Sequence, residues 1–297
     1  IEFYLALRGP GGVQQLMLRT ADPKAPREIT PSLDDQVDDM RLLQNAGLWE
    51  VARRSQALVL HTPGARERIE RETGVSPQVL PFAHYRSFVP EHRSQAERSA
   101  ARTRLGIESS EDVIHLATFG YVDVRTKLTD VVVEAAGWLA HWGHRVALYV
   151  VGAANAEQEA ALAKRAQSWG LADFRVTGFQ AEEQFQDWLL AVDLGIQLRV
   201  SPLLGVSGPL SDLAAFGTPA VASQGLCVDV EAPDYVHRLP DAVSPVTVAE
   251  AIEAALRAPV PADEVERERQ EYLARLAPSR YAARLRGLLE QLRESTA

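Results

Sequence analysis

Short apolar runs alternate with longer amphipathic segments along much of the chain. The runs are bounded by small or polar residues, as buried strands are, whereas apolar residues recur every three or four positions in the segments between them, as in helices. The expected strands are residues 113–119, 145–152, 174–177, 193–198 and 218–222. The expected helices are residues 128–142, 156–169, 181–191 and 206–216. Strands and helices that alternate over short connections predict an α/β fold with a doubly wound parallel sheet.

Residues 193–223 combine a strand, a glycine-rich turn, a helix and a second strand, which is the pattern of a βαβ crossover. Ser201 and Pro202 end the first strand, residues 205–208 form the turn, and Gly217 ends the helix. In an open parallel sheet, ligands bind at the carboxyl ends of the strands, and a helix that starts after small residues presents N–H groups to an anion. The turn therefore predicts a phosphate site or, as the alternative, only a tight connection.

The amino-terminal part of the chain is less regular. Two apolar runs on either side of residues 9–12 predict a hairpin, with a glycine loop that touches a phosphate as the alternative. Prolines then indicate a loop, and Ser32 is a candidate N-cap for a helix over residues 33–54. The next expected elements are a strand at residues 57–60, a helix at residues 65–73 and a strand at residues 78–81.

Residues 90–111 are polar and charged with few large apolar side chains, which indicates a linker and a surface helix at a domain boundary. Beyond the sheet region, the pattern predicts a helix at residues 248–257 and two amphipathic helices within residues 262–294, separated at Pro278. We therefore expect an amino-terminal domain over residues 1–92, a second domain over residues 108–260, and closing helices over residues 261–297.

The chain is acidic, with a net charge of −9 over 297 residues and a pI near 5.4. This balance argues against a general role in nucleic-acid binding, although a phosphorylated small molecule needs only a local group of cations. The single cysteine, Cys227, lies in an apolar run and predicts a buried core thiol, with no internal disulfide and no cysteine metal site. No apolar run approaches the length of a membrane span, so we expect a cytoplasmic protein with peripheral membrane contact at most.

Four segments are informative as an ordered set. They are FGYVDVRTK at residues 119–127, LYVVGAA at residues 148–154, the stretch over residues 169–199, and SGPLSDLAAFGTPAVAS at residues 207–223. Together they resemble the nucleotide-sugar-binding domain of GT-B glycosyltransferases, specifically the retaining, family-4-like group. Residues 55–82 resemble the end of the other domain of that fold, and LAPSRYAARLRGLLEQL near the carboxyl terminus resembles its tail helix. The resemblance implies that the helices within residues 261–297 pack back on the first domain. The resemblance implies two Rossmann-like domains that face a cleft, with a short or incomplete amino-terminal domain.

The resemblance also implies that basic residues after the first strand of this domain grip the donor diphosphate. In the family, Gly-Arg follows that strand and a lysine stands a few residues later. Here Gly120 keeps its place, Tyr121 stands at the arginine position, and Arg125 and Lys127 supply the positive charge. Lys127 is therefore the expected phosphate ligand and catalytic residue, with Arg125 beside it, because charged hydrogen bonds to phosphate are strong. Exposed loop cations without such a role are the alternative.

A second catalytic candidate, Arg199, ends the strand at residues 193–198 and is expected to offset charge on the leaving diphosphate. The family has two glutamates eight positions apart around the glycine-rich turn. Asp212 stands at the second position, which implies that it accepts hydrogen bonds from the ribose. Leu204 stands at the first position and cannot accept a bond from the transferred sugar, so the chain departs from the family there. An ion pair between Arg199 and Asp212 is the alternative.

The resemblance implies further donor contacts from the turn and from the loop after the third strand. Backbone N–H groups of the turn are expected to meet the phosphate or sugar, and the loop is expected to pack on the base. The residues concerned are Gly205, Val206, Ser207 and Gly208 in the turn, and Gly178 and Phe179 in the loop. In the other domain, residues 11–12 and His61 are the candidates for the Gly-Gly loop and the histidine of the family. His61 and His84 both follow expected strands, and a structural role is the alternative for each.

These residues support a retaining glycosyltransferase as the leading hypothesis. The donor would be a UDP or GDP sugar with no metal required, and the acceptor a glycan, a lipid-linked molecule or a secondary metabolite. A non-catalytic GT-B homologue that binds nucleotide or serves as a partner subunit is the alternative, motivated by Leu204 and the short first domain. A sugar-nucleotide epimerase is a third hypothesis, but its proton transfers need carboxylates in the cleft, and the turn offers only Asp212.

Overall fold

The computed structural model describes residues 49–86, 90, 93–108, 110, 112–200 and 205–296. The expected hairpin around residues 9–12, the helix start at Ser32 and the turn position Leu204 lie outside these residues. The chain divides into two compact units. The first comprises residues 1–82, 202–205 and 281–297, and the second comprises residues 83–201 and 206–280.

The second unit is built on a six-stranded parallel sheet. Its strands are β3 (Val113–Phe119), β4 (Arg145–Val151), β5 (Asp173–Val176), β6 (Leu194–Gln197), β7 (Ala220–Ser223) and β8 (Val236–Leu239). They lie in the order β5-β4-β3-β6-β7-β8, so the chain builds first on one side of β3 and then on the other. This order creates a topological switch point between β3 and β6, where open α/β sheets bind ligands at the carboxyl ends of their strands.

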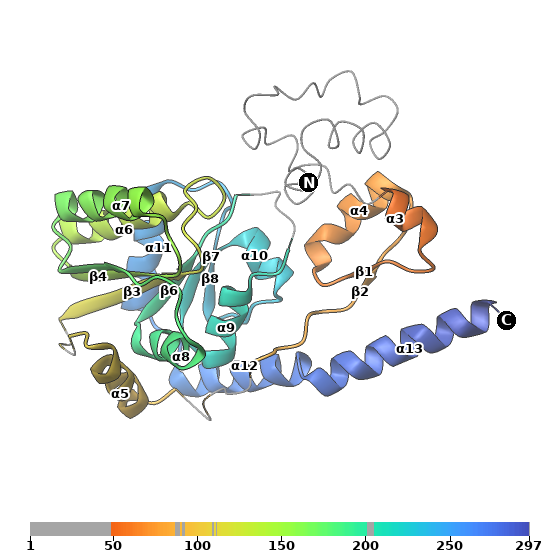
Figure 1. Ribbon diagram of the computed structural model, residues 1–297. Coiled ribbons are helices and arrows are strands. Elements are labelled where there is room, and N and C mark those ends of the chain that lie inside the picture. The colour runs from red at the N-terminus through yellow and green to blue at the C-terminus, as the bar shows by residue number, and fades with distance from the viewer. Residues whose placement is uncertain are drawn as a thin grey trace, which may run out of the picture. The chain divides into compact units, whose positions relative to one another are not determined.

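Helices cover both faces of this sheet (Figure 1). On one face, α6 (Thr129–His141), α7 (Ala156–Trp169) and α11 (Pro245–Arg257) contribute to a core that includes Leu139 and Leu162. On the other face, α8 (Glu182–Ala191), α9 (Gly208–Phe216), α10 (Gln224–Asp229) and α12 (Ala262–Arg275) contribute to a core that includes Leu189 and Phe216. The predicted doubly wound α/β architecture is therefore confirmed. Among the helices of the described residues, none combines the length and the apolar content that a membrane span needs.

The elements predicted between residues 113 and 223 all form close to their predicted ends. In α7, for example, the Asn155 side chain accepts a hydrogen bond from the N–H of Gln158 at 2.8 Å, and Gly170 ends the helix with a φ of 68°. Such caps satisfy backbone groups that a helix leaves unpaired at its ends. The pattern did not predict α10, which has only six residues, or β8, whose two middle residues are not buried.

α5 (Gln95–Leu105) occupies the stretch that the sequence indicates as a linker and a surface helix. The helix is present, and the side chain of Ser94 caps it by accepting a bond from the N–H of Glu97. Most of its residues are exposed or half-buried, as in a surface helix, and one face packs against α8, where Ala101 is fully buried and Arg102 is only 6% exposed. A buried arginine leaves no trace in a pattern of apolar positions.

The described part of the first unit is small. It contains α3 (Trp49–Arg54), β1 (Val59–Leu60), a 3-10 turn (Pro63–Ala65), α4 (Arg66–Thr73), β2 (Gln78–Val79) and most of α13 (Pro278–Thr296). β1 and β2 pair in parallel, and Ala52, Leu58 and Ile69 form part of a local core. Gly74 ends α4 in a left-handed conformation with a φ of 70°, as the sequence predicts.

β3 and β4 approach so closely at their carboxyl ends that no side chain fits at Gly152. A Cβ there would lie 1.9 Å from the carbonyl oxygen of Gly120. We expect Gly152→Ala to push the β3 loop away from β4 and to lower the free energy of unfolding by about 2–3 kcal/mol, because backbone cannot yield as a side-chain tip can. Urea denaturation measures this change. Gly287→Ala is the matched control, since its Cβ would meet open space on α13 and is expected to stabilise the helix by about 0.5–1 kcal/mol. Equal effects of the two substitutions would contradict the close contact.

Candidate functional site

Two cations stand at the switch point of the sheet. Lys127 lies in the loop after β3, and Arg199 follows β6, where its backbone N–H donates to Oγ of Ser223 at 2.9 Å. The backbone N–H of Val200 donates to the carbonyl oxygen of Thr126 at 2.9 Å, which ties the two loops together. β3 and β6 are themselves neighbours in the sheet. The structure therefore brings together the two residues that the sequence predicts as catalytic.

The loop between β3 and α6 is shaped by Asp123. Its Oδ1 accepts hydrogen bonds from the backbone N–H groups of Arg125 at 2.8 Å and Thr126 at 3.0 Å. The hydroxyl of Thr129, in the first turn of α6, donates to the carbonyl oxygen of Asp123 and accepts from its N–H, both at 3.2 Å. Leu128 takes a φ of 53°, a left-handed conformation that residues other than glycine rarely adopt. The loop thus presents its basic residues in a defined shape.

The ammonium group of Lys127 packs against this loop. Its Nζ lies 3.7 Å from the centre of the Tyr121 ring, in cation–π contact, and 2.5 Å from where a Cβ on Gly120 would stand. Burial and the positive charge of Arg199 lower the pKa of Lys127 to about 8, against the opposing effect of Asp123. Burial also lowers the pKa of Arg199. Two desolvated cations close to each other favour an anionic ligand between them.

The start of α9 lies next to the same loop. A Cβ on Gly120 would stand 4.0 Å from Cγ of Pro209, in the first turn of this nine-residue helix. Ser207 caps the helix, its Oγ accepting a bond from the N–H of Leu210 at 3.3 Å. The positive end of the helix dipole therefore adds to the attraction of the two cations for an anion. The predicted turn residues are Gly205 with a φ of 135°, half-buried Val206, buried Ser207 and half-buried Gly208.

Asp212, on α9, is buried and already paired. Its side chain is 1% exposed, and its two oxygens accept hydrogen bonds from Nε and Nη2 of Arg86 at 3.2 and 2.8 Å. Nε2 of His84 lies 3.7 Å from Oδ1. A bidentate arginine–carboxylate contact of this kind is the strong form of the pair. The partner of Asp212 is thus Arg86, and the alternative of an ion pair with Arg199 is wrong.

Arg86 is the site residue that sequence reasoning missed. It bridges Asp212 on α9 and Glu182 at the start of α8, and its guanidinium lies 4.6 Å from the centre of the Phe185 ring and 4.9 Å from that of Tyr85. The Arg86 side chain is only 11% exposed. Arg86 and Asp212 are 126 positions apart, so no local pattern joins them. Because Asp212 is the predicted ribose acceptor, Arg86 uses the hydrogen bonds that a ribose would need.

The predicted base-contact residues lie beyond β5. Gly178 takes a φ of 72°, which favours glycine, and the Phe179 ring that follows is 90% exposed. An aromatic ring this exposed at the carboxyl edge of a sheet can stack on a planar base. Arg125, on the β3 loop, is also exposed.

The two candidate histidines have structural surroundings. In the first unit, Nδ1 of His61 lies 2.9 Å from the carbonyl oxygen of Leu80, and its ring centre lies 5.1 Å from that of Phe82. In the second unit, His84 is buried.

Cys227 is 1% exposed, which confirms the predicted core thiol, and burial raises its pKa to about 11.

Comparisons with known proteins address the fold. No protein-family model matches the chain, and no curated protein matches it. Solved structures do match. The Anabaena protein HepE in complex with UDP and glucose aligns with a TM-score of 0.67 at 16% identity, over 84% of this chain and 67% of that chain. Sucrose-phosphate synthase from Thermosynechococcus elongatus aligns with a TM-score of 0.64 at 17% identity, over 92% of this chain and 66% of that chain.

The chain has the GT-B fold. A third match of the same fold is WaaG, a glycosyltransferase involved in lipopolysaccharide biosynthesis, with a TM-score of 0.57 at 18% identity, over 73% of this chain and 58% of that chain. This chain therefore spans about two thirds or less of the length of these GT-B proteins. Within the GT-B fold, the switch point of the second unit carries Lys127, Arg199 and the start of α9 on one edge of one sheet.

Proposed function

We propose that this chain binds a nucleotide-diphosphate sugar and acts as a glycosyltransferase. The observation that carries the proposal is the meeting of Lys127, Arg199 and the start of α9 at the switch point of the sheet. Two desolvated cations beside a helix N-terminus suit a diphosphate. The GT-B fold and the UDP and UDP-glucose complexes of the Anabaena protein support the same class of ligand.

In the proposed reaction, an acceptor hydroxyl oxygen bonds to the anomeric carbon of the sugar as the bond from that carbon to the diphosphate oxygen breaks. Negative charge then grows on the departing diphosphate, and Lys127 and Arg199 stabilise it. The departing phosphate oxygen takes the proton of the hydroxyl, so no protein nucleophile is assigned, and the configuration at the anomeric carbon is retained. The acceptor belongs to the glycans, lipid-linked molecules or small molecules with a free hydroxyl.

The nucleoside would lie along the same edge of the sheet. Phe179 would stack on the base of a UDP or GDP donor, next to the backbone of Gly178. Asp212 would accept the ribose hydroxyl bonds, which requires Arg86 to release the carboxylate. Ribose and Arg86 would therefore compete for one acceptor.

The buried pairing of Asp212 also favours a second candidate, a non-catalytic homologue that binds nucleotide or serves as a partner subunit. Asp212 is engaged by Arg86, and Leu204 stands where the family pattern has a sugar-binding glutamate. Both features would weaken binding of the donor sugar, but Lys127 and Arg199 would still bind the diphosphate. This candidate predicts nucleotide binding without turnover.

Calorimetric titration with UDP, GDP, UDP-glucose and a GDP-sugar, followed by assays of nucleotide release, tests both candidates. Binding with release of nucleotide and transfer to an acceptor supports the glycosyltransferase. Binding without release across a broad acceptor panel supports the non-catalytic homologue. If none of the four nucleotides binds, both candidates are wrong.

Diphosphate binding is expected to weaken as the pH rises through about 8. Burial and Arg199 lower the pKa of Lys127 to about 8, so the ammonium of the ligand-free protein loses its proton near pH 8. The phosphate ionises near pH 6, so its charge no longer changes in this range. Folding lowers the pKa of Lys127 below the unfolded value of 10.5, so the unfolded state holds more protons between pH 8 and 10.5. The contribution of Lys127 to stability therefore rises with pH in that window. Raising the pH should thus lower the affinity for UDP, whereas deprotonation of Lys127 should not destabilise the folded protein. In Lys127→Arg, the same pH dependence of UDP titrations should disappear, and its persistence would contradict the assignment.

A further inference from the structure

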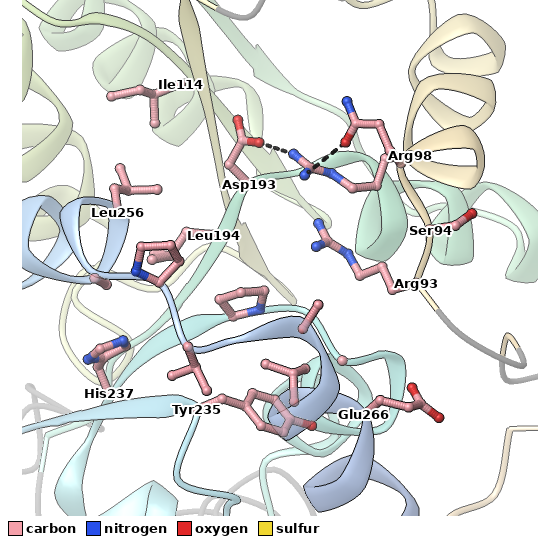
Figure 2. A pocket seen from close by; sticks show the side chains of 18 of the residues that line it. Arg93, Ser94, Arg98, Ile114, Asp193, Leu194, Tyr235, His237, Leu256 and Glu266 are labelled. Atoms are coloured by element: carbon pink, nitrogen blue, oxygen red, sulfur yellow. Dashed lines mark hydrogen bonds and ion pairs between the residues drawn. The ribbon is translucent and has the colours of Figure 1, made fainter.

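A cavity of about 870 Å³ lies at the edge of the sheet where the strands begin (Figure 2). Val113 starts β3 and Leu194 starts β6, and both line the cavity. Residues of α5 line one side, and residues from the end of α11 to the start of α12 line another. All the lining residues belong to the second unit. The cavity is separate from the switch-point site, because Lys127 and Arg199 follow the opposite ends of the same strands.

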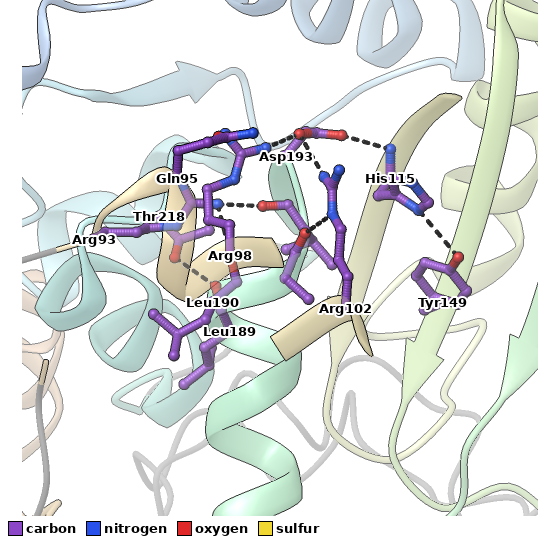
Figure 3. Close-up of polar contacts among 12 residues, drawn as sticks. Arg93, Gln95, Arg98, Arg102, His115, Tyr149, Leu189, Leu190, Asp193 and Thr218 are labelled. Carbon is purple, nitrogen blue, oxygen red and sulfur yellow. Dashed lines mark hydrogen bonds and ion pairs between the residues drawn. The ribbon is translucent and has the colours of Figure 1, made fainter. Parts of the chain in front are cut away.

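One end of the cavity holds an arginine cluster, which consists of Arg93, Arg98, Arg102 and the carboxylate Asp193 (Figure 3). Oδ1 of Asp193 accepts a bond from Nη2 of Arg102 at 2.9 Å and another from Nη2 of Arg98. Oδ2 accepts a bond from the backbone N–H of His115 at 2.8 Å. Two guanidinium groups thus bond one oxygen of Asp193, whose other oxygen is also bonded, and Arg93 lies close enough to feel its charge.

Part of the cluster holds the carboxyl end of α8. Arg93 and Arg102 donate hydrogen bonds to three backbone carbonyl oxygens there, those of Leu190, Ala191 and Val192. Such bonds satisfy the last carbonyls of a helix and complement its dipole. They do not use Nε of Arg93 or Nε of Arg98, which are buried without a hydrogen-bond partner among the described residues. Arg93 and Arg98 therefore keep N–H donors that the hydrogen bonds to the end of α8 do not use.

The arginine cluster has more positive charge than Asp193 neutralises. A guanidinium stays charged at neutral pH, so among the described residues of the cluster three positive charges accompany one carboxylate. Burial and the nearby Arg98 lower the pKa of Arg93 to about 9, and burial and Arg102 lower that of Arg98. Crowded cations of this kind are stabilised by an added anion.

The other carboxylates on the cavity wall do not provide this compensation. Asp263 is exposed at the start of α12. Glu266 binds Arg269 instead, with Oε1 2.8 Å from Nη2 of that arginine. Figure 2 shows Glu266 across the cavity from Asp193 and Arg98, with the guanidinium of Arg93 directed into the space between.

The remaining wall is largely apolar. Tyr235 contributes its ring, since its hydroxyl donates to the carbonyl oxygen of Ala214, and burial lowers the pKa of His237, which disfavours its charged form. The aliphatic lining includes Ile114, Leu194, Pro219, Leu256, Val260 and Val265. A ligand that matched the whole cavity would therefore be charged at one end only.

We propose that this cavity binds an amphiphilic anion, a single carboxylate or phosphate on an apolar body. The anionic group lies on Arg93 and Arg98, and the apolar body lies against Leu194, Leu256 and Val260. This site is independent of the proposed sugar-nucleotide site.

Titration with decanoate and decyl phosphate below their micellar concentrations tests the proposal, with decanol and inorganic phosphate as partial ligands. We expect at least one of the two amphiphilic anions to bind and to raise the melting temperature, and the tighter of the two identifies the headgroup. Decanol lacks the anionic group and inorganic phosphate lacks the apolar body, so each should bind at least about tenfold more weakly. Equal binding of decanol, equal binding of inorganic phosphate, or no binding by either anion would overturn the proposal and leave the arginines as a helix cap only.

Substitutions locate the ligand. Arg98→Gln removes a guanidinium that holds no α8 carbonyl, and we expect it to weaken binding of the anion roughly 10–150-fold, the loss of one charged hydrogen bond. Arg104→Gln is the matched control on α5, because Arg104 is 55% exposed and pairs with Asp187, and it should leave binding unchanged. Leu256→Trp fills the apolar end and should abolish binding without touching the cluster. Binding of the anion that survives both Arg98→Gln and Leu256→Trp would contradict the proposed site. Lys127→Ala should leave binding of the amphiphilic anion unchanged.

Discussion

Lys127→Ala is expected to weaken nucleotide-diphosphate binding roughly 10–150-fold, because one charged hydrogen bond to phosphate contributes about 1.5–3 kcal/mol. The lysine has no acidic hydrogen-bond partner in the described residues, and the charged groups that shift its pKa are Arg199 and Asp123. Its removal should therefore relieve repulsion rather than unfold the loop, so the melting temperature should hold. Calorimetric titration with UDP or GDP, whichever binds the unaltered protein, measures the change.

Lys164→Ala is the matched control for this prediction. Lys164 is an exposed lysine on α7, so its loss removes the same charge from the surface of a helix. Nucleotide affinity should stay within about twofold of the unaltered protein, as expected for an exposed charge that is screened by water and salt. If Lys127→Ala and Lys164→Ala bind nucleotide equally well, Lys127 does not hold the diphosphate.

Asp212→Ala is expected to lower the free energy of unfolding by about 3–5 kcal/mol, the usual cost of removing one partner from a buried ion pair. The substitution leaves Arg86, which is 11% exposed, without its bidentate acceptor and with only Glu182 nearby. Urea denaturation measures this loss. The double substitution Asp212→Leu with Arg86→Met replaces the pair by apolar side chains and should recover most of it. A single substitution that costs no more than the double one would show that the pair is not buried in solution.

Arg86→Met separates structure from ligand binding. It frees the Asp212 carboxylate, so UDP should bind more tightly than to the unaltered protein if the ribose competes with Arg86. The same variant should be less stable in the absence of nucleotide, because the buried Asp212 carboxylate loses its arginine partner. Weaker binding of UDP to Arg86→Met would instead place Arg86 itself on the nucleotide.

The sheet of the second unit could be predicted because its strands are buried on both faces. β4, for example, is buried at six of its seven positions, which produces a continuous apolar run that is recognisable without neighbours. β8 is an edge strand with a half-exposed middle, His237 and Arg238, and therefore shows neither an apolar run nor clean alternation. Arg199 could then be located at the end of a strand that the pattern had defined, whereas Lys127 was located by the resemblance of residues 119–127 to the family.

The polar partners could not be predicted in this way. Arg86 meets Asp212 across 126 positions, and Arg102 meets Asp193 across 91. These contacts exist only after the sheet has brought the segments together. The arginine-rich sequence of α5 is typical of a solvated helix, and only its packing against α8 buries Arg102.

The position of Arg86 along the chain has a consequence for motion. It lies shortly after Phe82, where the first long segment of the first unit ends and the chain enters the second. The Arg86–Asp212 ion pair therefore holds the connecting segment to α9. A nucleotide that took over this carboxylate would release the segment around Arg86 from α9. By thermodynamic reciprocity, any change that released this segment would favour the nucleotide to the same extent.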